Sequence, residues 1–317
     1  MVSVDVHDEI NGLSISDIKK RVSGKTIAMV THRGLDHLFP SEEVLMRSLR
    51  KYEFRCDAVA WDDESVPWLD YDVVLLRACW NYYLDYQRFC KWIQFIEDSE
   101  IPLWNPPEVI RWNMSKTYLG GLANRKKIHV IPTHFVERGS QVDLRDILET
   151  KAWTEGVIKP MIGAGAFETY RTNLGSASHM QRKFENILKD RGVMVQPFVP
   201  EILKGEYSLI FIANKYSHTV LRKPRSNDFR VGYGHGGTEE LIIPRQRLRQ
   251  QVEAVVAEIN TPLLYARVDG IDTAEGFLLM EIELIEPRLS FDLFPNGAER
   301  LAQAMAMMSP TFKGEIK

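Results

Sequence analysis

Apolar runs alternate with amphipathic stretches along the first hundred residues of the chain. Three runs have the length and composition of buried strands: 25–30 (KTIAMV), 54–61 (FRCDAVAW) and 71–80 (YDVVLLRACW). Two stretches have helical periodicity, the first starting at a serine followed by acidic residues: 41–52 (SEEVLMRSLRKY) and 86–99 (YQRFCKWIQFIEDS). Strands that alternate with helices in this way favour a parallel α/β layer.

The rest of the chain divides into two further segments. The proline-containing stretch PLWNPPEV interrupts the first pattern, so we place a boundary near residue 113. Helices and strands then alternate up to VMVQPFV, and after about residue 200 a hairpin, a long helix, two strands and a closing helix are expected. The predicted organisation is an N-terminal arm (1–24), an α/β domain (25–113), a central domain (114–200) and a C-terminal domain (201–317).

Composition excludes several classes of protein. The 317 residues are 44% hydrophobic and 26% charged with a net charge of −3, which is typical of globular proteins and gives no sign of a nucleic-acid partner. Three cysteines without CxxC spacing predict neither a disulfide framework nor a zinc site, and indicate a reducing cytoplasm. The N-terminus has no signal-peptide pattern, and no run reaches the roughly 20 apolar residues that cross a bilayer.

Acidic residues on two consecutive strands are the strongest sign of chemistry. In LLYARVDG, Arg267 and Asp269 share one face, because side chains two apart in a strand point the same way. In the next strand Glu281 and Glu283 lie opposite an apolar face that is expected to hold Leu278, Met280, Ile282 and Leu284. If the strands pair, Asp269, Glu281 and Glu283 converge, and such carboxylates repel one another unless a cation such as magnesium neutralises them. A solvated sheet face is the competing interpretation, and the orientation of Glu286 before Pro287 is left open.

A lysine followed by small residues is the second sign. Lys159 ends an apolar strand, and GAGAFET follows, where Gly163 and Gly165 let the backbone approach a phosphate closely. The stretch fits neither the GxxxxGK[ST] nor the GxGxxG pattern, and a flexible turn is the competing interpretation. Lys116 lies at the start of a predicted helix, where a solvated lysine is the competing interpretation. VMVQPFVPEI is an apolar strand followed by a proline-containing linker; a generic strand is the favoured interpretation, and a place for an adenine is the alternative.

Taken in order, these segments resemble the ATP-grasp superfamily. The phrases that carry the resemblance are LLRACWNYY, WNPPEVIRWNMSKTYL, VIKPMIGAGAFETYR, VQPFVPEI, GEYSLIF, YSHTVLRKP, NDFRVGYGHGG and YARVDG…LLMEIELIEP. They cover about residues 70–290 and are most similar to the O-ureido-D-serine cyclo-ligase and glutathione-synthetase-like branch. The resemblance implies an α/β (α+β) ATP-grasp fold, with a central lid and a C-terminal antiparallel-sheet subdomain that hold ATP between them.

The resemblance also implies roles for individual residues. Contacts with ATP are implied for Lys116, Lys159, Gly163, Gly165, Gln196, Phe198, Val199, Glu201 and Glu206. Magnesium or manganese would be held by Asp269, Glu281 and Glu283, and the transferred phosphate would be met by Lys223 and Arg230. Substrate contacts are implied for Arg77, Trp80, Asn81, Tyr82, His235, Gly236, Arg267 and Arg288. The chain departs from the family pattern at Asn81, where an aspartate is expected, and at Arg288, where a small residue is expected.

The expected activity is ATP-dependent activation of a small amino-acid-like carboxylate as an acyl phosphate, which an amine or ureido nucleophile then attacks. Two alternatives stay open: an ATP-binding sensor without ligase chemistry, and a small-molecule phosphotransferase on the same scaffold. The expected partner is a small molecule and neither nucleic acid nor membrane, and a homodimer is compatible with these features.

Overall fold

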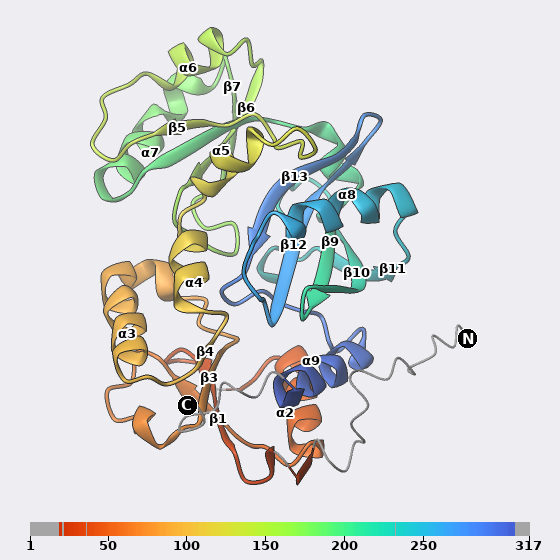
Figure 1. Ribbon diagram of the computed structural model, residues 1–317. Helices are drawn as coiled ribbons and strands as arrows, with labels where there is room; N and C mark the ends of the chain where they lie inside the picture. The colour runs from red at the N-terminus through yellow and green to blue at the C-terminus, as the bar shows by residue number, and fades with distance from the viewer. Residues whose placement is uncertain (1–18, 21, 36, 232, 308–317) are drawn as a thin grey trace.

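The computed structural model describes residues 19–20, 22–35, 37–231 and 233–307. Three sheets follow one another along this part of the chain and are stacked in the molecule (Figure 1). The predicted arm (1–24) lies almost wholly outside the described residues. The mixed α/β class and the parallel N-terminal layer are confirmed, whereas the predicted domain boundaries stay predictions.

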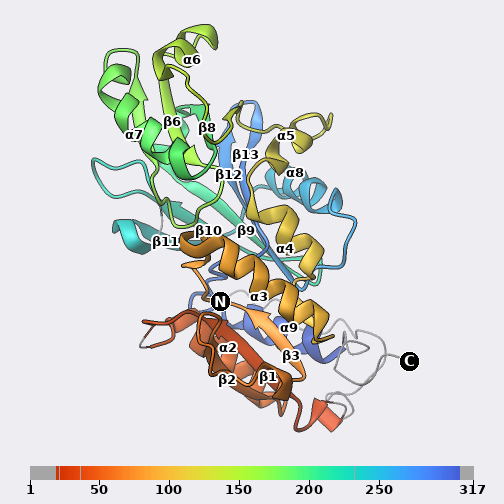
Figure 2. The same cartoon turned by 90° about the vertical axis from the view of Figure 1, so that its left-hand side faces the viewer.

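The N-terminal layer is a parallel sheet with the strand order β2-β1-β3-β4. Its strands are β1 (Thr26–Thr31), β2 (Arg55–Ala60), β3 (Val73–Leu76) and β4 (Leu103–Trp104). One face packs on α2 (Pro40–Lys51) and on α9 (Pro295–Met307), which returns from the far end of the described chain. The other face packs on α3 (Tyr86–Asp98) and α4 (Pro107–Met114), as Figure 2 shows. The helix α9 therefore completes the N-terminal layer, although residues 32–294 lie between it and β1 in the sequence.

The central sheet is antiparallel, with the order β5-β8-β6-β7. It contains β5 (His134–Val136), β6 (Glu155–Pro160), β7 (Tyr170–Asn173) and β8 (Val193–Pro197). The helices α6 (Leu144–Thr150) and α7 (Ala177–Asp190) cover one of its faces. The side chains of the opposite face, including Lys159 and Gln196, are turned toward the third sheet.

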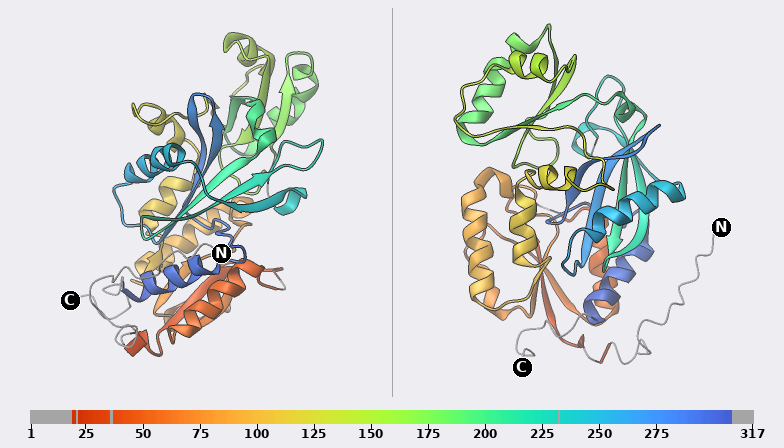
Figure 3. Two further views of the ribbon diagram at one scale, coloured as in Figure 1. Left: turned by 90° about the vertical axis from the view of Figure 1, so that its right-hand side faces the viewer. Right: turned by 45° about the horizontal axis from the view of Figure 1, so that its top comes forward.

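The third sheet is also antiparallel, with the order β11-β10-β9-β12-β13 (Figure 3). It contains β9 (Glu206–Ile212), β10 (Lys215–Lys223), β11 (Thr238–Ile242), β12 (Tyr265–Thr273) and β13 (Gly276–Glu283). Its outer face packs on α5 (Tyr118–Ala123) and α8 (Gln246–Ala257). Short 3-10 turns occur at Trp68–Asp70, Tyr82–Asp85, Pro200–Lys204 and Tyr233–His235. The sequence pattern does not indicate β4, β7, β11 or α4. The strand β4 has only two residues, β7 and β11 are short strands with several polar residues, and α4 begins at a proline of the stretch interpreted as a break.

A β-bulge corrects the predicted face of β13. Asp269 pairs with Glu281, but the next residue, Gly270, pairs with Leu279, so Met280 is the extra residue. Met280 therefore joins Leu278 in the apolar cluster on the inner face, whereas Ile282 and Leu284 pack on the outer face. The prediction that all four share one face was wrong, because strict alternation does not continue through a bulge. A Cβ at Gly270 would lie 2.5 Å from the Leu278 carbonyl oxygen, so the bulge needs glycine there.

Buried side chains join the N-terminal layer to the third sheet. Asn105 donates to the carbonyl oxygens of Tyr265 (2.9 Å) and Leu284 (2.7 Å) and accepts from the Leu264 N–H (2.9 Å). Asn113 and Tyr118 bond the backbone at Ile282 and Leu284. These bonds satisfy backbone groups at strand ends, and they fix the third sheet against the segment that follows the parallel layer.

We predict that Asn105→Ala lowers the free energy of unfolding by about 3 kcal/mol or more, because it leaves three buried backbone groups without partners. Equilibrium denaturation measures the loss. The matched control is the exposed Asn186→Ala, and equal, small effects of the two substitutions would contradict the role of Asn105.

Candidate nucleotide site

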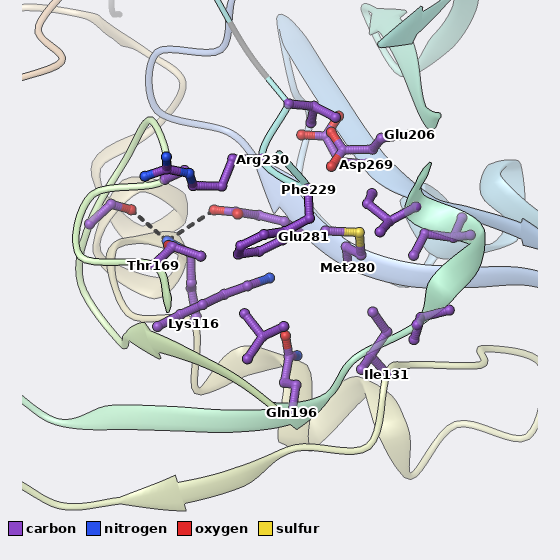
Figure 4. Close-up of a pocket in the computed structure, with 18 of the residues that line it drawn as sticks. Lys116, Ile131, Thr169, Gln196, Glu206, Phe229, Arg230, Asp269, Met280 and Glu281 are labelled. Carbon is purple, nitrogen blue, oxygen red and sulfur yellow. Dashed lines mark hydrogen bonds and ion pairs between the residues drawn. The ribbon is translucent and has the colours of Figure 1, made fainter. Parts of the chain in front are cut away.

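A single pocket between the central and third sheets collects most of the predicted site residues (Figure 4). It is lined by strands of both sheets and by the small-residue loop after β6. The predicted residues that line it are Lys116, Lys159, Gly163, Gly165, Gln196, Phe198, Val199, Glu206, Arg230, Arg267, Asp269, Glu281 and Glu283. Residues that lie far apart in the sequence thus share one cavity.

Arg267 holds the acidic side of the pocket together. Its guanidinium bonds both oxygens of Asp269 (2.8–3.0 Å) and one oxygen of Glu283 (2.5 Å), and Nη1 donates to the Arg288 carbonyl oxygen (3.1 Å). Strand register explains these contacts, because Arg267 lies opposite Glu283 and Asp269 lies opposite Glu281. The predicted convergence of the three carboxylates on one face is confirmed. An arginine from the same face neutralises two of them.

A lysine pairs with the third carboxylate. Lys116 Nζ lies 3.0 Å from Glu281 Oε1 and donates to the Gly163 carbonyl oxygen at 2.5 Å (Figure 4). The Lys116 backbone N–H also donates to the Met161 carbonyl oxygen. Lys116 therefore ties the small-residue loop to β13, at the point where the two sheets face each other.

Burial and charge act in opposite directions on these carboxyl groups. Burial alone would raise the pKa of Asp269, but the charges of Arg267 and Arg222 and the bonds to Arg267 and Ser208 hold that pKa below its usual value. Burial raises the pKa of Glu283 to about 7 and that of Glu206 to about 7, despite the nearby arginines. Glu286, just beyond β13, is buried, and burial together with the Glu283 charge raises its pKa to about 8. A cation that entered here would favour the charged forms.

The carboxylates suit a magnesium ion by their chemistry. The carboxylate oxygens of Asp269 already accept hydrogen bonds from Arg267 and Ser208. The side chains of Glu281 and Glu283, in contrast, are 28% and 26% exposed at the pocket wall. Magnesium usually takes one or two protein carboxylates and fills its shell with water and phosphate oxygens. Among the described residues, no three acidic, histidine or cysteine side chains form a ready-made metal cluster. The donors therefore fit an ion that arrives with phosphate oxygens, and the metal assignment stays a prediction.

Lys159 is a cation without a protein counterion. It lines the pocket at the end of β6 and has no hydrogen-bond or ion-pair partner among the described residues. Burial lowers its pKa, although the charges of Glu281 and Glu206 act in the opposite direction. An unpaired ammonium that is largely removed from water costs free energy unless a ligand neutralises it, and Lys159 is half-buried. This end of the pocket is therefore suited to an anion.

The other half of the pocket is apolar. Ile131, Ile202 and Ile271 form a buried cluster with Phe198 and Phe229 packed against it. The two phenylalanine rings meet edge-on at 6.0 Å, and the Arg171 guanidinium lies 3.6 Å from the Phe198 ring centroid. A flat heterocycle fits among such side chains, so the pocket has one charged end and one end suited to a base.

Arg222 is a site residue that the sequence reasoning missed. It lines the pocket and pairs with Glu206 (3.1 Å), with Glu239 (3.7 Å) and with Asp269 (3.8 Å). The neighbouring Lys223, predicted to meet the transferred phosphate, points to the opposite face of β10, where it pairs with Glu240 and is 46% exposed. The strand pairing would have identified Arg222, because it lies directly opposite Glu206, but this register cannot be read from the sequence pattern alone. The structure does not bring Lys223 into the pocket.

The loop between β10 and β11 brings Arg230 to the pocket. Asp228 binds its guanidinium through Nε (3.1 Å) and Nη2 (3.0 Å) and also accepts from the Phe229 N–H. Arg230 is 32% exposed and has this single carboxylate partner among the described residues, whereas Arg222 and Arg267 each have several. His235 does not line the pocket, but its Nε2 lies 3.2 Å from the Gly165 carbonyl oxygen, so the loop that holds His235 and Gly236 meets the small-residue loop.

The residues predicted to touch substrate from the N-terminal layer lie outside this pocket. Arg77 is fully buried and bonds Glu42 (3.2 Å) and the Pro287 carbonyl oxygen (2.7 Å). Trp80 donates to the Glu286 carbonyl oxygen at 2.9 Å. Asn81 accepts from Trp61 and donates to Asp62, and Tyr82 is buried in the layer's core. Arg77 and Trp80 thus join the layer to the segment after β13.

Two further predicted residues lie beside the pocket. Arg288 pairs with Glu239 (3.0 Å) and Asp292 (2.9 Å), and its backbone carbonyl oxygen accepts from Arg267. Glu201, predicted to meet the ribose, lines a separate surface groove with Lys204 and Arg245. Glu206, the other candidate for that contact, is in the pocket. The assignments of Arg288 and Glu201 stay predictions.

Comparison with known families agrees with this geometry. Residues 27–105 match the N-terminal domain of D-cycloserine synthetase DcsG, and residues 123–289, more than half of the chain, match the ATP-grasp domain of prokaryotic glutathione synthetase. The chain belongs to the ATP-grasp family. The fold and family predictions are therefore confirmed, and with them the class of ATP-grasp ligase.

Individual relatives of this protein also belong among the ATP-grasp ligases. The cycloserine biosynthesis protein DcsG of Streptomyces lavendulae is 28% identical over 280 residues, which cover 83% of this chain and 91% of the relative. A glutathione synthetase of Prochlorococcus marinus (strain MIT 9313) is 25% identical over 232 residues, covering 71% of this chain and 70% of the relative.

Solved structures show the same fold. The crystal structure of D-cycloserine synthetase DcsG has a TM-score of 0.79 and 25% identity, and it covers 89% of this chain and 99% of its own. The D-alanine–D-alanine ligase of Bacillus anthracis in complex with ATP has a TM-score of 0.67 and 15% identity, covering 91% and 97% of the two chains. The second likeness concerns the fold alone. No helix in the described part of the chain is both long and apolar enough to cross a membrane.

Arg222 and Lys223 provide a matched test of the geometry. We predict that Arg222→Met weakens magnesium-ATP binding by about tenfold or more, because it removes the arginine that pairs with Glu206 and leaves Asp269 with Arg267 alone. Lys223→Met should stay within about threefold of wild type, because exposed ion pairs contribute little. Isothermal titration calorimetry measures both. A larger effect at Lys223 than at Arg222 would contradict the assignment.

Proposed function

We propose that this ATP-grasp protein is an ATP-dependent ligase that activates a small amino-acid-like carboxylate as an acyl phosphate for attack by an amine or ureido nucleophile. The observation that carries the proposal is Lys159, a half-buried cation that has no counterion in the described part of the chain and lies at the charged end of a pocket whose other end is apolar. A nucleoside triphosphate has the matching polarity. The similarity to a cycloserine biosynthesis protein along most of the chain supports an amino-acid-derived substrate.

Different residues of the pocket would contact the phosphates, the ribose and the adenine of ATP. Lys159 and Lys116 would contact phosphate oxygens, and the backbone of the loop at Gly163 and Gly165 would approach them closely. The adenine would lie at Phe198 and Val199, and Glu206 would accept a ribose hydroxyl. In this arrangement the nucleotide would span the pocket, with its base at the apolar cluster and its phosphates near the carboxylates.

Phosphoryl transfer depends mainly on alignment and on neutralising charge. Arg230 would meet the transferred phosphate, because Asp228 occupies Nε and Nη2 and leaves Nη1 for a ligand. Arg222 would take the role first expected of Lys223, since it is the basic residue of that pair inside the pocket. A guanidinium presents several N–H donors in a planar fork, which suits the oxygens of a phosphoryl group as the acyl phosphate forms.

Glu281 and Glu283, with Asp269 beside them, would hold magnesium. When bound, the ion would offset negative charge on the phosphate oxygens. The Lys116 ammonium group contacts both Glu281 and the small-residue loop. When ATP binds, it would replace part of its contact with Glu281 by a contact with a phosphate oxygen.

The reaction also requires that water be kept from the acyl phosphate. The contact between His235 and the Gly165 carbonyl oxygen joins the two loops that border the charged end. We propose that these loops cover the reacting groups, and that the substrate lies between them and the segment from Glu286 to Arg288. Arg77 and Trp80 would support that segment from the N-terminal layer.

Lys159→Met tests the phosphate contact. We expect at least a tenfold loss of magnesium-ATP affinity by calorimetry, because a charge-assisted contact is removed, with little change in thermal unfolding of the free protein. Lys151→Met, at an exposed lysine outside the pocket, is the matched control. Unchanged affinity in the Lys159 variant would contradict the proposed role.

The activity itself is tested by screening amino acids and their ureido and hydroxylamine derivatives for release of ADP and phosphate from magnesium-ATP. A ligase gives both products with a new amide or ring, and EDTA or Glu281→Gln should lower the rate by at least a hundredfold. A stable phosphorylated product without free phosphate would indicate a phosphotransferase. Nucleotide binding without turnover across the screen would favour a sensor.

A further inference from the structure

Arg222 lies between two glutamates on the strands to either side of it. In the third sheet Arg222 on β10 pairs with Glu206 on β9 and with Glu239 on β11, so the three residues share one register. Arg222 Nη1 donates to Glu206 Oε1 at 3.1 Å, whereas Nε lies 3.7 Å from Glu239 Oε1. The arginine is therefore hydrogen-bonded to one carboxylate and only close to the other.

The Arg222 guanidinium is incompletely satisfied in this arrangement. Its Nε is enclosed by the protein and has no hydrogen-bond partner among the described residues, which is unfavourable for a buried N–H group. A shift of roughly 0.8 Å toward Glu239 would give Nε a hydrogen bond of the usual length. Because the two glutamates lie on opposite sides of Arg222, the same shift would lengthen the bond to Glu206. The two carboxylates therefore compete for one guanidinium.

Glu239 is anchored on its other side. Its Oε2 accepts from Arg288 Nε at 3.0 Å and from Ser290 Oγ at 3.4 Å, and the Arg288 guanidinium also binds both oxygens of Asp292. The side chain of Glu239 is 14% exposed and does not line the nucleotide pocket. Glu239 is thus a fixed carboxylate that joins Arg222 to the segment after β13.

We propose that Glu239 is a positioning residue that takes over Nε of Arg222 when ATP enters the pocket. This rests on the proposed function, in which a ribose hydroxyl donates to Glu206 and Arg222 meets the transferred phosphate. The hydroxyl competes with Arg222 for the Glu206 carboxylate, and Arg222 moves toward Glu239. With Nε bound there, the two terminal nitrogens face the phosphate together as a planar fork. Glu239 itself touches neither the nucleotide nor the reacting groups.

The experiment measures binding of magnesium-ATP and of magnesium-2′,3′-dideoxy-ATP to the full chain by calorimetry. The second nucleotide lacks both ribose hydroxyls and cannot compete with Arg222 for Glu206. We expect wild type to prefer ATP by about tenfold or more. Glu239→Gln should reduce this preference by about threefold or more, because Arg222 then has no charged alternative to Glu206 and the ribose must displace it.

The controls separate this role from a structural one. Glu240→Gln removes the neighbouring carboxylate, which pairs with the exposed Lys223 instead, and should leave the preference for ATP unchanged. Glu239→Gln keeps an acceptor for Arg288 and Ser290, so thermal unfolding of the free protein should change little.

A structural defect would weaken both nucleotides alike and leave the affinity ratio intact. Equal binding of the two nucleotides by wild type, or an unchanged ratio in the Glu239 variant, overturns the inference alone. If neither nucleotide binds to wild type, the proposed function fails and the inference with it.

Discussion

The acidic side of the candidate nucleotide pocket depends on the hydrogen bonds of the buried Arg267 guanidinium. Asp269 is buried and Glu283 lies close to it at the pocket wall, so without a cation their mutual repulsion and the lost hydration of Asp269 would be costly. Arg267 offers its donors in a fixed planar fork, so it binds Asp269 side-on and still reaches Glu283 and a backbone carbonyl oxygen. The carboxylates thus remain in place in the free protein.

Two further cations have different roles because their partners differ. Lys116 binds both Glu281 and the small-residue loop, so it connects the two sheets as well as neutralising charge. Lys159 lacks a protein partner in the described structure, so its charge makes this end of the pocket suited to an anion. The same cavity therefore holds paired charges that stabilise the fold and an unpaired charge that suits a ligand.

The pocket also depends on how the third sheet is mounted. Asn105 and Tyr265 bond strand ends of both layers, with the Tyr265 hydroxyl within 3.0 Å of carbonyl oxygens at Leu76, Trp104 and Ile285. Helix α9 packs against α2 and the parallel sheet, so the end of the described chain is part of the same base. The N-terminal layer acts as a platform for the carboxylate-bearing strands, and the central sheet faces them across the pocket.

The sequence by itself determined most of the strands and helices, the shared face of Arg267, Asp269, Glu281 and Glu283, and the proximity of Lys159 to a glycine-containing loop. Those features follow from local periodicity and residue type, which act over a few residues. Only the tertiary structure decided between Arg222 and Lys223, because their roles depend on which face of β10 meets Glu206. It also placed Leu278 and Met280 inside, because a bulge in β13 shifts the alternation.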